Sequence, residues 1–379
     1  MTNDDAPALA VDGGSPLRPQ PYPDAPVFEA ADDASPMLAL EREFATLLGV
    51  PEDRVHAYGS HTGAYESAVM VAGVTGGEMV VPALLGRAAA AAARNAHARV
   101  VPGEVETDIA ALSARGLTRA ISDQTVAIGV AHAFGHPAAM TEILALAEQR
   151  GVPVIEDCSD ALGAAFRGRP VGTMGVASVF ALGAGHALTA GYPKLQTRAA
   201  MLVVPDAAHA DRAQRARFVT GARLDEPSAA VALAELRALP ATLAARRQLA
   251  WELTFNLRGM RAVVGMPHTR WVHHAYDRYV IRIRSLLWKR TLEDTVAAIR
   301  AEGVPCEVAC GPSLHLDATV RAELRSEDGG DDERLLETHF VAAGRLPGEL
   351  IAIPLHANLT SKDMDEVAQV LRKIERWST

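Results

Sequence analysis

Long apolar runs, cysteine and lysine are all scarce in this sequence of 379 residues. No stretch of 18 or more apolar residues occurs, and the start, MTNDDAPALA, is acidic where a signal peptide is basic. We therefore expect no membrane span and a cytoplasmic location. The cysteines Cys158, Cys306 and Cys310 are an odd, widely spaced set without the second pair that a zinc site needs. We expect unpaired thiols and no metal site.

Positive charge is also limited. The chain has 37 lysines and arginines against 46 acidic residues, a net charge of −9. The arginines are spread singly among alanines, so no basic stripe exists to displace the counterions of a nucleic acid, and we expect no nucleic-acid partner. The lysines are Lys194, Lys289, Lys362 and Lys373, and all but Lys194 lie in the C-terminal third.

Strands alternate with helices of ten or so residues through most of the chain. Strand Met79–Val81 is an example, and we expect a helix over Asp108–Arg115. This alternation predicts an α/β fold with a large, doubly wound, mainly parallel sheet. A change to strand-helix-strand pieces near the C-terminus predicts a smaller α/β domain there. We expect an N-terminal arm at 1–36, a large domain at 37–250 and a small domain at 251–379.

The stretch Val152–Gly191 carries the main functional signal. Its first residues are apolar and β-branched and continue without a turn into Glu156 and Asp157. A parallel strand ends in this way, and open α/β sheets bind ligands at that carboxyl end. A Gly-rich passage and a second buried strand, Ser178–Leu182, follow, and then His186 in a loop of small residues. We expect Asp157 and His186 to face a ligand.

A second candidate site is the run Ser60-His61-Thr62-Gly63, which joins a short strand to an apolar-periodic helix. This layout directs free backbone N–H groups and the positive end of the helix dipole at an anion such as a phosphate. Helix capping by Ser60 or Thr62 explains the same residues equally well. Both interpretations stay open on the sequence alone.

These motifs together resemble the DegT/DnrJ/StrS family of pyridoxal 5′-phosphate (PLP) enzymes, chiefly sugar aminotransferases, over nearly the whole chain. The resemblance implies the fold type I PLP-transferase architecture. It places Asp157 at the aspartate that pairs with the pyridine nitrogen, and His186 at the lysine that forms the Schiff base. Phe180, Thr189 and Gly191 match the family pattern on both sides of His186 and fix this register.

The same resemblance makes Ser60, His61, Thr62 and Gly63 the cradle of the cofactor phosphate, with His61 in place of a glycine. It also implies substrate contacts from Arg223, Lys194 and His356, and a homodimer whose active sites form at the interface.

Three further positions depart from the family pattern. Gly86 replaces an aromatic residue that stacks on the cofactor, and Gly221 replaces an asparagine that reaches the phosphate of the neighbouring subunit. Asp160 replaces the usual glutamine or histidine and adds a second negative charge near the cofactor ring.

Three functions fit this pattern. Histidine forms no stable imine but can move a proton near neutrality, since its ordinary pKa is about 6.5. His186 and Asp157 therefore predict an elimination or proton transfer next to a carbonyl, with PLP or pyridoxamine phosphate (PMP) bound noncovalently. The substrate would be a sugar nucleotide or a cyclic natural-product precursor. The first alternative is a PLP-free member with a repurposed cleft or a noncatalytic partner role. The second is an aminotransferase that uses Lys194.

Overall fold

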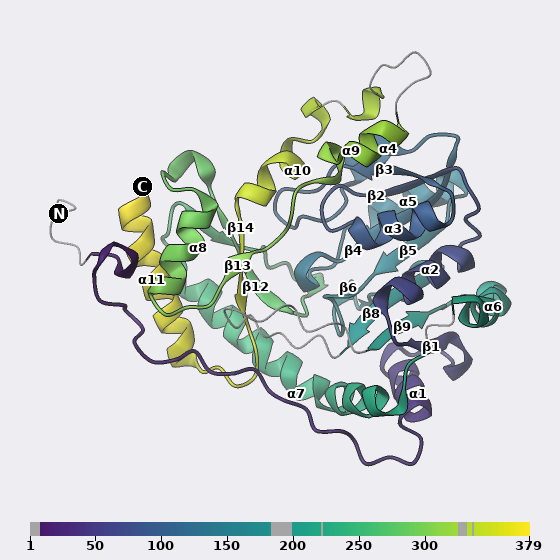
Figure 1. Ribbon diagram of the computed structural model, residues 1–379, viewed down its shortest axis with the longest axis horizontal. Helices are drawn as coiled ribbons and strands as arrows, with labels where there is room; N and C mark the ends of the chain where they lie inside the picture. The colour runs from purple at the N-terminus through teal and green to yellow at the C-terminus, as the bar shows by residue number, and fades with distance from the viewer. Residues whose placement is uncertain (1–7, 183–198, 221–222, 325–331, 336) are drawn as a thin grey trace.

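The structure is a computed structural model that describes residues 8–182, 199–220, 223–324, 332–335 and 337–379, with the backbone alone described for 217–220. A seven-stranded sheet and a four-stranded sheet organise these residues. In Figure 1 the larger sheet and its helices lie on the right, and the smaller sheet lies on the left. The expected α/β class with a large sheet is confirmed, while the predicted domain boundaries stay a prediction.

The large sheet has the strand order β1-β9-β8-β5-β4-β2-β3. Its central strands run parallel to one another, and β9 runs antiparallel to both β8 and β1. The strands are β1 (Val55–Tyr58), β2 (Glu78–Pro82), β3 (Arg99–Gly103), β4 (Thr125–Ala131), β5 (Val154–Asp157), β8 (Ala177–Leu182) and β9 (Ala199–Val203).

Both faces of this sheet are apolar and covered, which is why its strands read as continuous apolar runs. Successive side chains alternate between faces, so Val179 packs in the core under one set of helices and Phe180 in the core under the other. The helices that pack on this sheet are α1 (Pro36–Leu48), which precedes its first strand, and α2 (His61–Val71), α3 (Arg87–Asn95), α4 (Ala114–Ala120), α5 (Met140–Arg150) and α6 (Ala210–Thr220). Residues of α1 belong to the core that contains Phe180, and residues of α2 to α6 belong to the other.

The small sheet is antiparallel, with the order β10-β12-β14-β13. Its strands are β10 (Val263–Gly265), β12 (Arg278–Ile283), β13 (Glu307–Val308) and β14 (Leu350–Pro354), and helices α8 (Leu292–Ala301) and α11 (Ser361–Ser378) share its core. A third sheet of short strands comprises β6 (Ala165–Phe166), β7 (Arg169–Pro170) and β11 (Val272–His273). Two short helices, α9 (Ala318–Glu323) and α10 (Val341–Arg345), lie between β13 and β14 in sequence.

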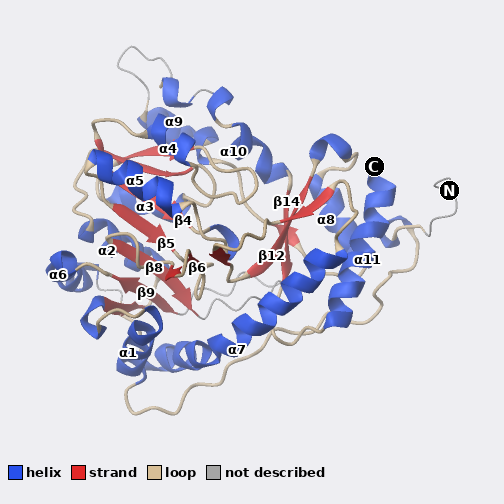
Figure 2. Ribbon diagram, turned by 180° about the vertical axis from the view of Figure 1, so that it is seen from behind, coloured by secondary structure: helices blue, strands red, loops and turns tan. Residues whose placement is uncertain are grey.

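Helix α7 (Glu226–Asn256) joins the two cores. Figures 1 and 2 show it running from α1, below the large sheet, to α11, beside the small sheet. Leu233 packs in the core of the large sheet, and Leu253 packs in the core of the small one. By length and composition α7 is the one helix among the described residues that could cross a membrane. Its contacts with both cores account for that apolar composition.

The N-terminal arm docks on the small-sheet half of the molecule. The buried carboxylate of Glu302 accepts the backbone N–H groups of Ala10 and Leu17, each at 2.8 Å, and pairs with the Lys373 ammonium at 2.8 Å. Arg18 pairs with Asp363 at 2.6 Å. These contacts fix a segment that composition alone describes only as polar and extended.

The prediction of a helix over Asp108–Arg115 is wrong. Val105 and Leu112 instead form an isolated β-bridge, and Ala110 between them has a φ of +53°, which an α-helix does not allow. Helix α4 begins only at Ala114, because the Ser113 hydroxyl accepts the N–H of Gly116 at 2.8 Å and caps the helix there.

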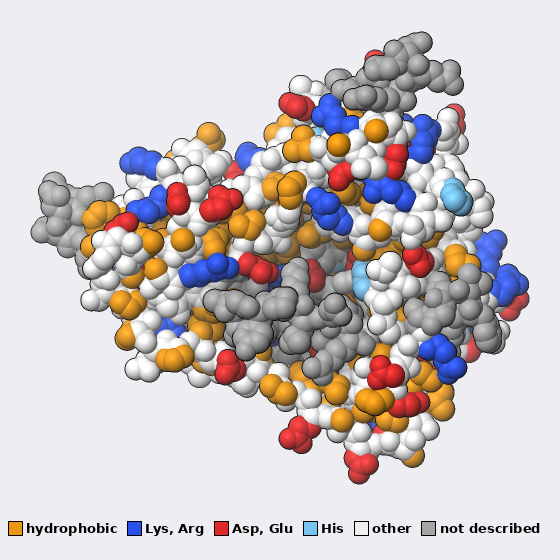
Figure 3. Space-filling model, in the orientation of Figure 1, with side chains coloured by type: hydrophobic (Ala, Val, Ile, Leu, Met, Phe, Trp, Pro, Cys, Tyr) orange, Lys and Arg blue, Asp and Glu red, His pale blue; other side chains and the backbone are white. Residues whose placement is uncertain are grey.

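Acidic, basic and apolar side chains are interspersed over the described residues on the face drawn in Figure 3. Blue basic groups on that face occur singly or in small clusters. The described residues on this face therefore form no continuous basic surface that could bind a polyanion.

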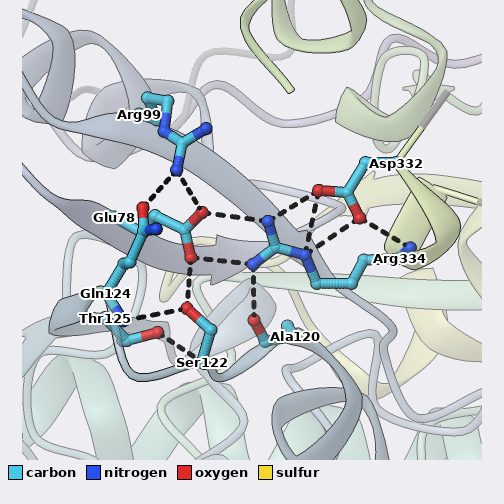
Figure 4. Close-up of polar contacts among 8 residues, drawn as sticks. All are labelled: Glu78, Arg99, Ala120, Ser122, Gln124, Thr125, Asp332 and Arg334. Atoms are coloured by element: carbon cyan, nitrogen blue, oxygen red, sulfur yellow. Dashed lines mark hydrogen bonds and ion pairs between the residues drawn. The ribbon is translucent and has the colours of Figure 1, made fainter. Parts of the chain in front are cut away.

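A buried carboxylate anchors a distant segment to the start of β2 (Figure 4). Glu78 is 1% exposed and accepts two hydrogen bonds from Arg334, at 2.7 and 2.9 Å. Arg99 at 2.9 Å and Ser122 at 2.6 Å complete its contacts, and Asp332 pairs with Arg334 at 2.6 Å. The cluster ties residues 332–335 to the amino end of the large sheet, opposite the edge that carries Asp157.

We expect Glu78→Gln to lower the free energy of unfolding by about 2 kcal/mol, since it removes the charge that Arg99 and Arg334 share. Urea denaturation at neutral pH measures this loss. Glu142→Gln, at an exposed glutamate of α5, is the matched control and should change stability by less than about 0.5 kcal/mol. Equal stability of the two variants would contradict the assigned role of Glu78.

The stability difference between wild type and Glu78→Gln should depend on pH. Burial opposes ionisation of Glu78, but hydrogen bonds from Arg334 and Ser122 outweigh it and lower the pKa of the carboxyl below its ordinary value. A lowered pKa in the folded state stabilises the protein above the unfolded value of about 4.3. The stability difference between wild type and Glu78→Gln should therefore persist at neutral pH and shrink as the pH falls through the folded pKa. A difference that grows in acid would contradict this.

Candidate active site

The start of α2 has the geometry of an anion site. Ser60 is extended, with φ −151° and ψ 142°, and its hydroxyl accepts the N–H of Gly63 at 3.1 Å. Ser60 is thus the helix cap. The first helical residues, His61 and Thr62, have N–H groups that helix geometry leaves without an intrahelical partner, at the positive end of the dipole. Thr62 is exposed, so this first turn can receive a ligand.

The carboxyl end of β5 brings Asp157 to the same place. Its Oδ1 atom accepts the N–H of Ser159 at 3.1 Å and the hydroxyl of Ser159 at 2.5 Å. The Nε2 atom of His61 lies 2.6 Å from the Ser159 hydroxyl and 3.9 Å from Asp157 Oδ1. Two candidate residues far apart in the sequence therefore meet through Ser159, which the sequence analysis missed.

The charges of this cluster reinforce one another. Burial opposes ionisation of Asp157, but the charge and hydrogen bonding of His61, together with the bonds from Ser159, lower the pKa of its carboxyl. Burial also opposes protonation of His61, but Asp157 and, more weakly, Asp160 raise the pKa of its imidazole above the ordinary value. Each group therefore favours the charged form of the other.

Asp160 forms an ion pair with a residue of the small sheet. Its carboxylate lies 3.1 Å from Arg278, which also contacts Asp277 at 2.8 Å and Glu307 at 3.8 Å. Three carboxylates outweigh the burial of Arg278 and raise the pKa of its guanidinium. Arg278 therefore offsets part of the negative charge of Asp160, and the pair links the edge of the large sheet to β12.

The position of the missing aromatic residue has no room for a ring. A Cβ atom added at Gly86 would lie 2.3 Å from the carbonyl oxygen of Pro82 and 3.2 Å from the side chain of Leu314. Leu314 belongs to the C-terminal half, and its N–H donates to the carbonyl of Ala83 at 2.8 Å. Glycine at this position thus permits close packing of the two halves of the chain.

The remaining predicted residues fall in three places. Arg223 is exposed, and its backbone pairs with Tyr58 immediately before the Ser60 turn. His356 is buried at the end of β14, where its ring packs edge-on against Tyr22 of the N-terminal arm at 6.2 Å. His186 and Lys194 lie outside the described residues, as does Gly221.

Glu156, the neighbour of Asp157, organises the loops below the site. It is fully buried and accepts N–H groups from Gly172 at 2.8 Å and from Met174 and Gly175 at 2.7 Å each. His132 Nε2 lies 3.0 Å from it. His132, Glu156 and Cys158 are close enough to hold a metal ion. Both ring nitrogens of His132 are already hydrogen-bonded, to Glu156 and to the N–H of Ala138, so protein contacts account for the cluster.

The sequence of this chain is similar to those of known proteins. One relative is an L-glutamine:scyllo-inosose aminotransferase of Streptomyces griseus, which is 34% identical over 55% of this chain. This chain spans about half of that relative, 53% of its length. The erythromycin biosynthesis sensory transduction protein EryC1 of Saccharopolyspora erythraea is 29% identical over 88% of both chains.

A crystal structure of DesI in the presence of its TDP-sugar product superimposes with a TM-score of 0.80 and 21% identity, over 97% of this chain and 96% of that one. It shows the shared fold. A model of the DegT/DnrJ/EryC1/StrS aminotransferase family, whose members depend on PLP, matches residues 34–372 and confirms the resemblance expected from the sequence. The chain belongs to the DegT/DnrJ/EryC1/StrS aminotransferase family.

Proposed function

We propose that this chain is an enzyme of sugar or natural-product biosynthesis that uses histidine rather than a Schiff-base lysine. The reaction is an elimination or proton transfer next to a carbonyl, with PLP or PMP bound noncovalently. The observation that carries the proposal is the cluster of Asp157, Ser159 and His61 beside the first turn of α2. The substitution of His186 for the lysine of the family pattern sets the type of chemistry.

The described residues fit the cofactor at two points. The first turn of α2 would hold the phosphate through the N–H groups of His61 and Thr62, with Ser60 fixing the turn. The hydrogen bonds that Asp157 accepts from Ser159 both reach Oδ1, so Oδ2 would suit the ring nitrogen. When bound, PLP or PMP supplies an electron sink for charge that develops at the substrate carbon.

The residues of the chain then divide the remaining work. His186 takes or gives the proton at the substrate carbon, a task that suits a pKa near neutrality. Arg223, Lys194 and His356 contact the substrate, which is a sugar nucleotide or a cyclic natural-product precursor. We propose a homodimer in which the active sites form between subunits. The inosose and sugar-nucleotide aminotransferases among its relatives support this substrate class.

A second candidate function is a PLP-free member of the family, with a repurposed cleft or a noncatalytic partner role. Two observations favour it. The His61 imidazole already lies 3.9 Å from Asp157, and Asp157 favours its protonated form. The packing of Leu314 and Pro82 around Gly86 leaves no aromatic face there for a cofactor ring. An aminotransferase that uses Lys194 is the third candidate.

Addition of PLP to the purified protein separates the three functions. We expect the absorption spectrum to show bound cofactor that borohydride does not fix to the chain and that dialysis removes. Peptide mass spectrometry after borohydride treatment then shows whether any residue carries a phosphopyridoxyl group. A phosphopyridoxyl group on Lys194 would overturn the proposal in favour of transamination, and absence of binding would favour the PLP-free function.

A histidine-to-lysine exchange tests the role of position 186. We expect His186→Lys to form the imine that wild type lacks, because the amine would return to the position of the family lysine. Borohydride should then label residue 186. The matched control is His273→Lys, at an exposed histidine of β11, which should stay unlabelled. Equal labelling of both variants, or of neither, would contradict the assigned register.

A further inference from the structure

The hydrogen bonds of Ser159 have a defined direction. A serine hydroxyl has one proton, and the ionised Asp157, 2.5 Å away, is the stronger acceptor for it. The Ser159 oxygen then accepts the hydrogen bond from His61 Nε2 at 2.6 Å. The chain of donors therefore runs from His61 Nε2–H to Ser159 and on to Asp157.

This direction leaves the other ring nitrogen of His61 for a ligand. About a fifth of the His61 side chain, 21%, is exposed. Within the part of the chain that the structure describes, the hydrogen bond of the His61 ring is made by Nε2, and none reaches Nδ1. The groups that face the ring are the Asp157 and Asp160 carboxylates and Tyr65, whose ring centroid lies 5.9 Å away. The Nδ1 atom thus belongs to a partly exposed ring in the first turn of α2, and the other nitrogen of that ring is the one engaged with Ser159.

We infer that His61 is a second acid–base residue of the cleft, and that Ser159 is its positioning residue. The inference rests on the proposed function, because an elimination next to a carbonyl needs both a base and an acid. His186 removes the proton from carbon as the C–H bond breaks and a carbon–carbon double bond forms. His61 gives its Nδ1 proton to the leaving hydroxyl, so that the C–O bond breaks and water departs. Solvent afterwards takes the proton from His186 and returns one to Nδ1 of His61, so that both residues recover their starting protonation.

Nuclear magnetic resonance of the full-length chain without added cofactor tests this unit. Long-range ¹H–¹⁵N spectra, recorded as a function of pH, report the pKa and the tautomer of each histidine. We expect His61 to titrate above the ordinary histidine value and to keep its proton on Nε2 when it becomes neutral. Ser159→Ala should abolish the tautomer preference, and Asp157→Asn should shift the pKa of His61 downward.

Two controls separate this result from a general loss of structure. Ser228→Ala removes an equivalent serine-to-aspartate bond, 2.9 Å long, from Ser228 to Asp225 at the start of α7 and should leave His61 unchanged. The exposed His97 should keep its signals in every variant.

An Nδ1–H tautomer, or a pKa of His61 that is unchanged in both Ser159→Ala and Asp157→Asn, would overturn the inference. This outcome is independent of the cofactor. If PLP binds without a covalent bond to a lysine but His61 titrates at the ordinary pKa, the proposed function is supported and the role of His61 as second acid is refuted. If PLP does not bind but His61 behaves as expected, the hydrogen-bonded set of His61, Ser159 and Asp157 is supported and the proposed function is refuted.

Discussion

The site depends on one electrostatic constraint, the need to keep the half-buried carboxylate of Asp157 ionised at the carboxyl end of β5. Removing a carboxylate from water raises its pKa unless donors and positive charge replace the lost hydration. Ser159 supplies two donors, and the His61 imidazole supplies the charge when it is protonated. The turn at Ser60 has to place His61 on α2 so that its ring reaches β5. The helix start and the strand end are therefore coupled, and the anion-binding turn and the acid lie side by side because of it.

The second half of the molecule is tied to this edge by charge and by packing. Arg278 of β12 pairs with Asp160, and Leu314 packs against the loop after β2 at Gly86. On the far side, Glu302 fixes the N-terminal arm, and α7 joins the two cores. Asp160 and Gly86 therefore both lie where the large-sheet half of the molecule contacts its C-terminal half.

Local patterns in the sequence predicted the architecture well. The alternating strands and helices and the strand that ends in Asp157 follow from periodicity and turn residues. The bridge that replaces the expected helix at Asp108–Arg115 depends on a left-handed Ala110, which propensity does not reveal. The bond between His61 and Ser159 joins residues 98 positions apart, so only the folded chain could disclose it. The same holds for the pairing of Asp160 with Arg278.

The central claim is that Asp157 and the first turn of α2 form a cofactor site that works without a covalent lysine. A crystal structure of the protein soaked with PLP tests it most directly. The account predicts the phosphate at His61 and Thr62, the ring nitrogen beside Asp157, and no electron density that joins the cofactor to a side chain. Continuous density from the cofactor to Lys194, or a ring that lies away from Asp157, would contradict the account.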